Sequence, residues 1–178
     1  DASGNSVSLS SNGNIVAIGA LFNNGNGNDS GHVRVYENIS GVWTQIGADI
    51  DGEAANDNSG WSVNLSSDGS IVAIGAHNND GVYKSNIGHV RVYKNVSGVW
   101  TQIGTEINGE APYDHSGWRV SLSSDGNILA IGAHSNDGNG IDSGHVRIYK
   151  NISGVWTQIG ADIDGEAVED YSGLSVSL

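Results

Sequence analysis

Short runs of alternating apolar and polar residues recur along the chain, and they predict β-strands throughout. Residues 62–66 place two apolar side chains between polar neighbours, which is the period-2 pattern of a half-buried strand. Residues 71–76 are apolar at nearly every position, which predicts a strand that is buried on both faces. Residues 89–93 and 99–103 complete a set of four strands, and no segment shows the 3.6-residue period of a helix.

Residues typical of turns separate these strands. Asp68–Gly69 lies between the first two strands and predicts a type I′ hairpin turn, in which both central residues have positive φ. Asn95–Gly98 separates the third strand from the fourth. A polar loop over residues 77–88 and a longer connector over residues 104–117 make the remaining joins. This order predicts a four-stranded antiparallel meander.

The meander is present in three near-identical copies. The segment SGHVRVYENISGVWTQIGADIDGEA begins at Ser30 and returns with few changes from Ile87 and from Ser143. Tandem four-stranded units of about 57 residues predict an all-β fold, a β-propeller in which neighbouring blades cover both faces of each sheet. The predicted blades are residues 1–56, 57–113 and 114–170, followed by the first strand of a fourth repeat at 171–178.

The motif order resembles a known repeat family. Gly-x-Ser-Val, a hairpin, Val-Ala-Ile-Gly-Ala, a loop and Gly-His-Val-Arg-Val-Tyr are similar to the FG-GAP repeat, the blade of integrin α-subunit propellers and of many bacterial surface proteins. Ser59-Gly60-Trp61 stands where that family has Phe-Gly, and Gly75-Ala76-His77 stands where it has Gly-Ala-Pro. The resemblance implies a propeller of such blades. A kelch-type propeller is the alternative, and the lack of a Gly-Gly doublet counts against it.

The same resemblance implies a calcium loop of the Asp-x-Asp-x-Asp-Gly kind in the first hairpin of a blade. This chain has Leu-Ser-Ser-Asp-Gly there, from Leu65 and from Leu122, and Leu-Ser-Ser-Asn-Gly from Leu9. One carboxylate or none does not supply the six to eight oxygen ligands that calcium takes. The resemblance makes calcium the possible ion, but because the usual loop is absent we expect no metal and no cofactor.

The charge and composition of the chain argue against several kinds of binding partner. A net charge of −13 with seven Lys and Arg residues argues against binding to nucleic acid or to anionic membranes. No apolar run approaches the roughly 18 residues of a membrane-spanning helix, so we expect no membrane insertion. The chain has no Cys, which excludes disulfides and thiolate metal sites. An acidic repeat rich in Gly, Asn and Ser predicts an extracellular or cell-surface location, typical of bacteria.

Three arginines hold one position in the third strand of each copy, and acidic residues line the connectors. They could form a repeated anion-binding ring, but ion pairs between blades are favoured, because the guanidinium fork suits carboxylates. The alternating acids could also clasp a hard cation, although arginine or solvent is the favoured partner. The residues of these expected pairs are Arg34, Arg91 and Arg147 with Asp49, Asp51, Glu53, Asp162 and Asp164.

Two pairs of histidines flank the loop between the second and third strands. His77 with His89, and His134 with His145, have the residue types of a zinc or copper site. The first copy has Leu21 in place of the first histidine, so such a site is not a property of the repeat. Polar loop ends are the favoured interpretation.

Two tryptophans begin the first strand of a copy, which is the strand nearest the axis of a propeller. Aromatic side chains at this place can stack on sugar rings or anchor a protein partner. We therefore predict that ligands bind at Trp61, Trp118 and the equivalent Asn5, while Leu174 holds the fourth position. The tryptophans of the fourth strand are interpreted as outer packing; they are Trp43, Trp100 and Trp156.

Because almost every polar residue is copied with the repeat, no catalytic constellation occurs only once, and we expect no enzyme activity. The leading hypothesis is a non-catalytic extracellular module for adhesion or for binding protein or glycan ligands. The alternatives are a structural subunit of an extracellular filament or stalk, and a lectin-like sugar binder. Three blades leave sheet faces without a neighbour, so the expected partners include further repeats or a second copy, besides a glycan or surface protein.

Overall fold

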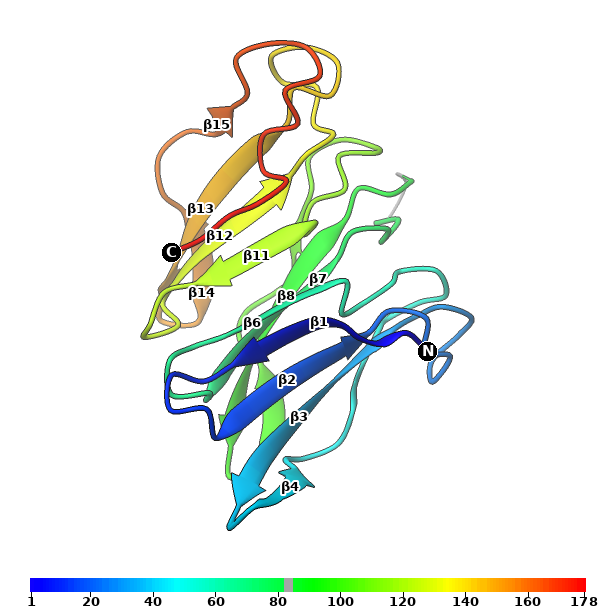
Figure 1. Ribbon diagram of the computed structural model, residues 1–178. Coiled ribbons are helices and arrows are strands. Elements are labelled where there is room, and N and C mark those ends of the chain that lie inside the picture. The colour runs from blue at the N-terminus through cyan, green and yellow to red at the C-terminus, as the bar shows by residue number, and fades with distance from the viewer. Residues whose placement is uncertain (82–84) are drawn as a thin grey trace.

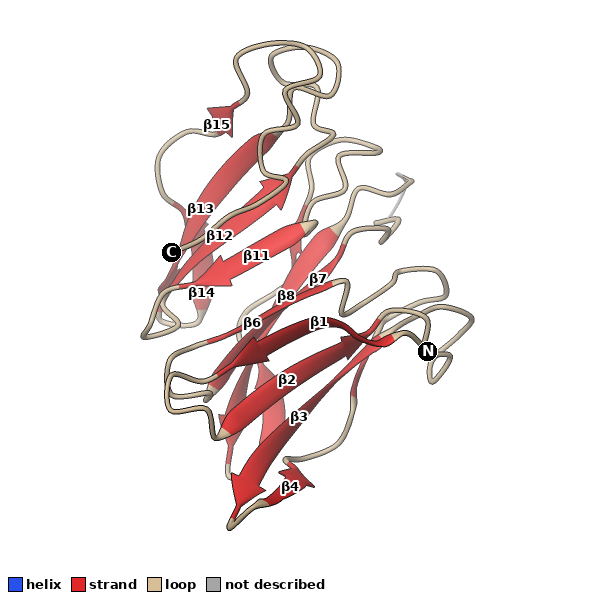
Figure 2. Cartoon of the chain, in the orientation of Figure 1, coloured by secondary structure: helices blue, strands red, loops and turns tan. Residues whose placement is uncertain are grey.

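The computed structural model describes residues 1–81 and 85–178, which form strands joined by loops (Figures 1 and 2). The predicted loop over residues 77–88 includes three residues outside this described part. Among the described residues no helix is long and apolar enough to cross a membrane. The strands form three antiparallel sheets that follow one another in chain order (Figure 1).

Each sheet contains four strands of a meander and a two-residue fifth strand. The first sheet consists of β1 (Ser3–Leu9), β2 (Ile15–Ala20), β3 (His32–Ile39), β4 (Val42–Gln45) and β5 (Ile50–Asp51). The second consists of β6 (Ser62–Leu65), β7 (Ile71–Ala76), β8 (His89–Val96), β9 (Val99–Gln102) and β10 (Ile107–Asn108). The third consists of β11 (Arg119–Leu122), β12 (Ile128–Ala133), β13 (His145–Ile152), β14 (Val155–Gln158) and β15 (Ile163–Asp164).

The predicted all-β architecture of tandem four-stranded antiparallel blades is confirmed. The first sheet has the order β1-β2-β3-β4, and the third repeats it as β11-β12-β13-β14. The strand pattern did not predict that the outer side of the third strand pairs with two separate short strands in each sheet. In the second sheet, residues 93–96 of β8 pair with β9, whereas residues 89–90 pair with β10. Between these two short strands the chain leaves the sheet over residues 103–106, which include Gly104.

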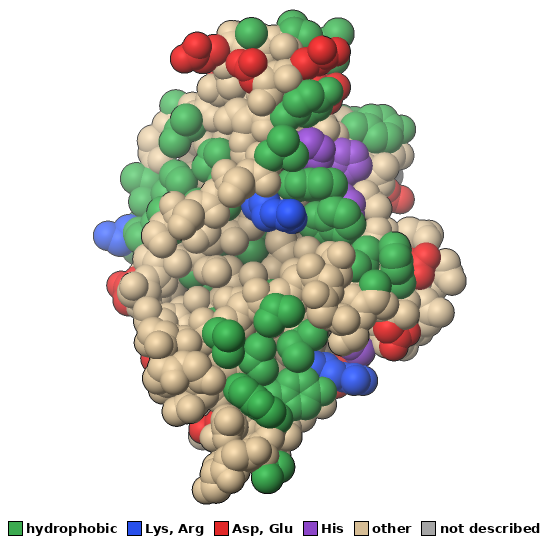
Figure 3. All heavy atoms as spheres, viewed as in Figure 1, with side chains coloured by type: hydrophobic (Ala, Val, Ile, Leu, Met, Phe, Trp, Pro, Cys, Tyr) green, Lys and Arg blue, Asp and Glu red, His purple; other side chains and the backbone are tan. Residues whose placement is uncertain are grey.

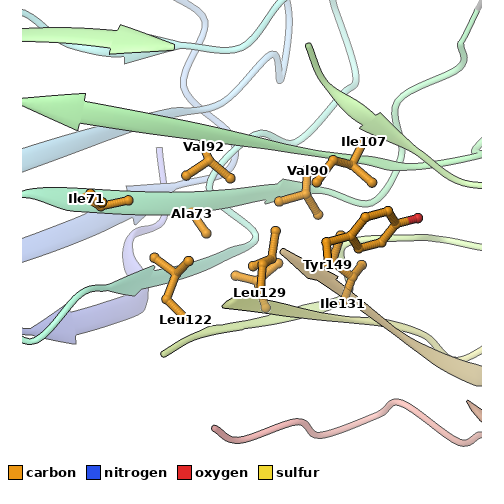
Figure 4. Packing of buried hydrophobic residues seen from close by; sticks show 10 residues of the cluster. Ile71, Ala73, Val90, Val92, Ile107, Leu122, Leu129, Ile131 and Tyr149 are labelled. Atoms are coloured by element: carbon orange, nitrogen blue, oxygen red, sulfur yellow. The ribbon is translucent and has the colours of Figure 1, made fainter. Parts of the chain in front are cut away.

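The second strand of the second sheet, β7, is buried on both faces, as its apolar sequence predicts. All six residues of β7 are buried. Val72 and Ile74 pack in a cluster with the first sheet, whereas Ile71 and Ala73 pack in a cluster with the third. Figure 4 shows the second cluster, where Leu129 of β12 meets the side chains of β7 and β8. Alternate side chains of one strand therefore serve two hydrophobic cores.

The type I′ turn lies in a different hairpin from the one predicted. Gly69 has a φ of +73°, but Asp68 is not in the left-handed region. The carboxylate of Asp68 accepts the amide of Ser70 at 2.9 Å, which holds this residue in an ordinary turn conformation. Both central residues have positive φ in the two-residue loop between β8 and β9, where Ser97 is at +53° and Gly98 at +86°.

The predicted first strand of a fourth repeat is not a strand in the structure. Residues 172–178 form one isolated parallel bridge, between Ser172 and Gly144. The amide of Leu178 donates to the Ser121 hydroxyl of β11 at 3.0 Å. These two contacts hold the segment against the third sheet without a strand ladder.

Candidate ligand-binding groove

An open groove of 390 Å³ crosses the first strands of all three sheets. Residues at corresponding positions of the three strands face it, because neighbouring sheets repeat the same register. Arg119 is the one charged residue among those that line the groove. The lining residues are Asn5, Ser6 and Val7 of β1, Trp61, Ser62 and Val63 at β6, and Arg119 and Val120 of β11.

Serine side chains join the strands under this groove. The Ser6 hydroxyl donates to the Gly60 carbonyl at 2.7 Å, and the Ser62 hydroxyl donates to the Gly117 carbonyl at 2.8 Å. Each bond joins one blade to the next. Since both serines are held in this way, the floor of the groove is ordered before any ligand arrives, which lowers the entropic cost of binding.

A row of aromatic and histidine rings lies at one end of the groove. The ring centroids of Trp61 and Trp118 are 4.6 Å apart, and each tryptophan has a histidine ring at 4.2 Å, His77 and His134 respectively. The tryptophans precede β6 and β11, and the histidines follow β7 and β12. Antiparallel pairing brings the start of the first strand beside the end of the second, so these positions meet at one end of each strand pair.

The row continues through the connectors. His115 lies 5.6 Å from His77 and 5.9 Å from His134, and Tyr171 lies 6.3 Å from His134, all between ring centroids. Burial, followed by the charges of His115, His134 and Arg119, lowers the pKa of His77 to about 3. The imidazole of His77 is therefore neutral at neutral pH.

Hydrophobic side chains and histidines gather side by side on one face, and acidic side chains lie toward its edges (Figure 3). The structure places the predicted Asn5 and Trp61 in the groove lining. Trp118 is not among the lining residues. Its ring lies between those of Trp61 and His134. Arg119 was not predicted as a site residue, although the sequence carries one signal: the equivalent positions in the other copies are Ser.

A second set of polar contacts joins the blades further from the groove. Arg91 of β8 lies 3.6 Å from Glu53, in the connector of the preceding blade, and donates to the Asp51 carbonyl at 2.8 Å. Arg147 of β13 repeats this arrangement with Glu110 at 3.5 Å. Both arginines are 5% exposed and also lie near a tyrosine of their own strand.

The aspartates of the connectors do not form these inter-blade pairs, contrary to the prediction. Arg34 instead binds Asp49 of its own sheet through contacts of 2.8 to 3.0 Å, and this lowers the pKa of Asp49. Asp162 and Asp164 lie 3.8 and 3.9 Å from His145, also within one sheet. The acids that reach the next blade are Glu53 and Glu110, and each directly follows the glycine after the short fifth strand of its sheet.

Two of these acidic groups have the residue types of a metal site, namely His32 with Asp49 and Asp51, and His145 with Glu110 and Asp162. In each group a guanidinium already lies beside one carboxylate, Arg34 at Asp49 and Arg147 at Glu110. An arginine at this place neutralises the charge that would attract a cation. These groups therefore fit the role of ion pairs better than that of a metal centre.

The histidines predicted as possible zinc or copper ligands are divided between two clusters. His77 and His134 belong to the aromatic row, whereas His89 and His145 face the acidic connectors. At the hairpin position of the family's calcium loop, the one carboxylate of the second blade is engaged in hydrogen bonds within the turn. There the Asp68 carboxylate accepts the Ser66 hydroxyl at 2.7 Å as well as the amide of Ser70.

The structure is thus an array of four-stranded β-blades tied together by hydrogen bonds and ion pairs. It contains an FG-GAP repeat, because residues 108–149 match the family model described as FG-GAP repeat. This match covers β11, β12 and most of β13, and it confirms the resemblance of the motifs.

No curated protein matches the chain at a significant level. Among solved structures, the chain is similar to the periplasmic gluconolactonase of Pseudomonas aeruginosa, with a TM-score of 0.43 and 15% sequence identity. The match covers 89% of this chain and 56% of the gluconolactonase chain. A likeness this distant says nothing about the ligand or reaction of this chain.

Proposed function

We propose that this chain is a non-catalytic, extracellular binding module whose groove over β1, β6 and β11 takes a saccharide or protein ligand. The observation that carries the proposal is the change of residue at one position of an otherwise repeated frame. Position by position, the blades offer Asn5, Trp61, Trp118 and Leu174, while Ser6 and Ser62, next to the first two of these, make the same hydrogen bond to the following blade. Varied side chains on a constant frame suit ligand recognition.

The chemistry of the groove supports a saccharide in particular. The half-buried ring of Trp61 offers an apolar surface, and the amide of Asn5 offers a donor and an acceptor for hydroxyl groups. The repeated arginines and acids serve as ties between neighbouring strands and blades, which supports a role without catalysis. Repeated weak sites along an array would gain avidity at a surface that presents many ligands.

Binding to an immobilised glycan array, followed by titration of the hits in solution, tests this proposal. Trp61→Asn places in the second blade the residue that the first blade has as Asn5, and we expect it to reduce binding strongly. Trp43→Asn is the matched control, because Trp43 is 46% exposed and lies in β4, outside the groove. Equal binding by both variants and the parent protein would contradict a role for the groove.

A structural role in self-association is the second candidate. Trp100 and Trp156 each donate their indole N–H to a carbonyl of the preceding sheet, at 2.8 and 3.0 Å. Trp43 has no such acceptor among the described residues, and Ile159, which holds the acceptor position in the third sheet, is 46% exposed. A second copy of the chain could therefore dock head to tail through the contact that the blades already use.

Light scattering over a range of protein concentrations tests the second candidate. We expect the average mass to rise with concentration and Trp43→Asn to suppress the rise. Ordered fibres in electron micrographs would support a filament subunit. A constant mass of 18.4 kDa at all concentrations would contradict it.

A further inference from the structure

We propose that the groove binds a saccharide unit bearing a carboxylate, with Arg119 pairing with the carboxylate and Trp61 packing against the sugar ring. This inference rests on the proposed binding function and specifies the class of ligand. It starts from the one position of the groove where a charged residue replaces a repeated serine.

Arg119 gives up a structural role that its counterparts perform. Ser6 and Ser62, at the same position of β1 and β6, each donate to a backbone carbonyl of the following blade. Arg119 instead donates to the carbonyl of Trp118 at 2.9 Å, and its guanidinium lies 6.0 Å from the centre of the Trp118 ring. The substitution thus exchanges a tie between blades for an exposed cation on an aromatic platform.

The charge of Arg119 is available to a ligand. Each of the three repeated arginines lies within 3.6 Å of a carboxylate, whereas Arg119 has no carboxylate at salt-bridge distance among the described residues. A guanidinium has five N–H donors, and the Trp118 carbonyl accounts for one of them. The remaining donors can bind a carboxylate in the bidentate geometry that arginine favours.

The other groups of the groove define the rest of the ligand. Trp61 supplies an apolar ring surface, and Asn5 supplies an amide that bonds to hydroxyl groups. A sugar acid combines a carboxylate, an apolar ring face and hydroxyl groups within one small unit, which suits a groove of 390 Å³. A monoanion suits the site better than a phosphate dianion, because the whole chain carries a net charge of −13.

The neighbouring histidines provide an independent report of an anion at Arg119. The pKa of His134 is lowered mainly by burial and further by the charges of His115 and Arg119, while Asp142 opposes the shift. A carboxylate bound to Arg119 offsets the arginine charge. The pKa of His134 should therefore rise when the acidic sugar binds, and a neutral sugar of the same shape should not raise it.

The experiment compares a galacturonate trisaccharide with a galactose trisaccharide by calorimetry, using the parent chain, Arg119→Ser and Trp61→Asn. Arg119→Ser is the matched variant, because serine is the residue of the other blades and is compatible with the fold. We expect the parent to favour the acidic sugar by about ten-fold or more, as for a charged hydrogen-bonded pair. Arg119→Ser should abolish this preference, and Trp61→Asn should weaken binding of both sugars.

Further outcomes separate this inference from the proposed function. Equal affinity for the two sugars, unchanged in Arg119→Ser, would overturn the inference and leave a saccharide-binding module in place. Binding of an acidic peptide at the groove without binding of galacturonate would also overturn it. If neither sugar bound and the glycan array stayed blank, the proposed saccharide function would fail as well. A rise in the pKa of His134, followed by NMR, must accompany acidic-sugar binding in the parent chain.

Discussion

Replacing Gly75 by alanine tests how closely the blades pack. Gly75 lies in β7, and a Cβ atom added there would be 2.1 Å from the carbonyl oxygen of Gly117 and 2.4 Å from the Ser62 hydroxyl. The φ of Gly75 is not in the left-handed region, so an alanine at this position tests space and not backbone strain. The blocking atom belongs to the backbone of the next blade, which cannot rotate away.

The size of the effect follows from how far the backbone of Gly117 must move to give the new Cβ atom an ordinary contact distance. An ordinary contact begins at 3.4 Å, so a Cβ at 2.1 Å requires the neighbouring backbone to move by more than an ångström. Overpacking of this kind typically costs about 1–3 kcal/mol. The shift also strains the 2.8 Å bond from Ser62 to the Gly117 carbonyl, which is worth about 1 kcal/mol. We therefore expect a loss of about 3 kcal/mol, or roughly 6–12 °C in Tm for a chain of this size.

Urea unfolding followed by circular dichroism measures this loss of stability. Gly25→Ala is the matched control, because Gly25 is exposed, its φ is ordinary, and the nearest atoms are the side-chain ends of Asn23 at 3.0 Å and Asp51 at 3.1 Å. The control should leave stability unchanged or raise it by a few tenths of a kcal/mol. If Gly75→Ala unfolds within about 0.5 kcal/mol of the parent, which is the scatter of ordinary surface substitutions, the close approach of the blades is refuted.

Three further predictions concern contacts of the second blade. Trp100→Phe removes the 2.8 Å bond to the Ile46 carbonyl and should cost about 1 kcal/mol in urea unfolding; an unchanged midpoint would show that the bond adds nothing. Glu53→Gln leaves the 5% exposed Arg91 without its carboxylate; the expected cost is about 1–2 kcal/mol, below the roughly 3–5 kcal/mol of a fully buried pair, because Glu53 is 45% exposed. Burial and then the charge of Arg91 lower the pKa of His89 from 6.5 to about 3, so the unfolded chain binds more protons between these values. Stability should therefore fall as pH drops below about 6.5, and His89→Gln should make this fall less steep, while His77 keeps its own share; equal slopes would exclude His89 as a contributor.

Residue patterns were sufficient to predict the blade and its repetition. Strands, turns and copies are local properties, because side-chain alternation and Gly-containing turns depend on a few neighbouring residues. For the same reason the two-sided burial of β7 follows from its apolar run. Local patterns could not determine the hairpin geometry at Asp68, where a side-chain hydrogen bond to Ser70 replaces the expected type I′ turn.

The groove and the ion pairs depend on how one blade lies against the next. The sequence determined which residue types each blade offers, including Trp61, Asn5 and the unrepeated Arg119. Only the tertiary structure decided that Arg91 meets Glu53, 38 residues earlier in the chain, and not an aspartate of the same connector. Such a choice depends on offsets of a few ångströms between neighbouring sheets. Charge and spacing along a single chain do not specify these offsets, because they arise from the packing of two hydrophobic cores on the opposite faces of one sheet.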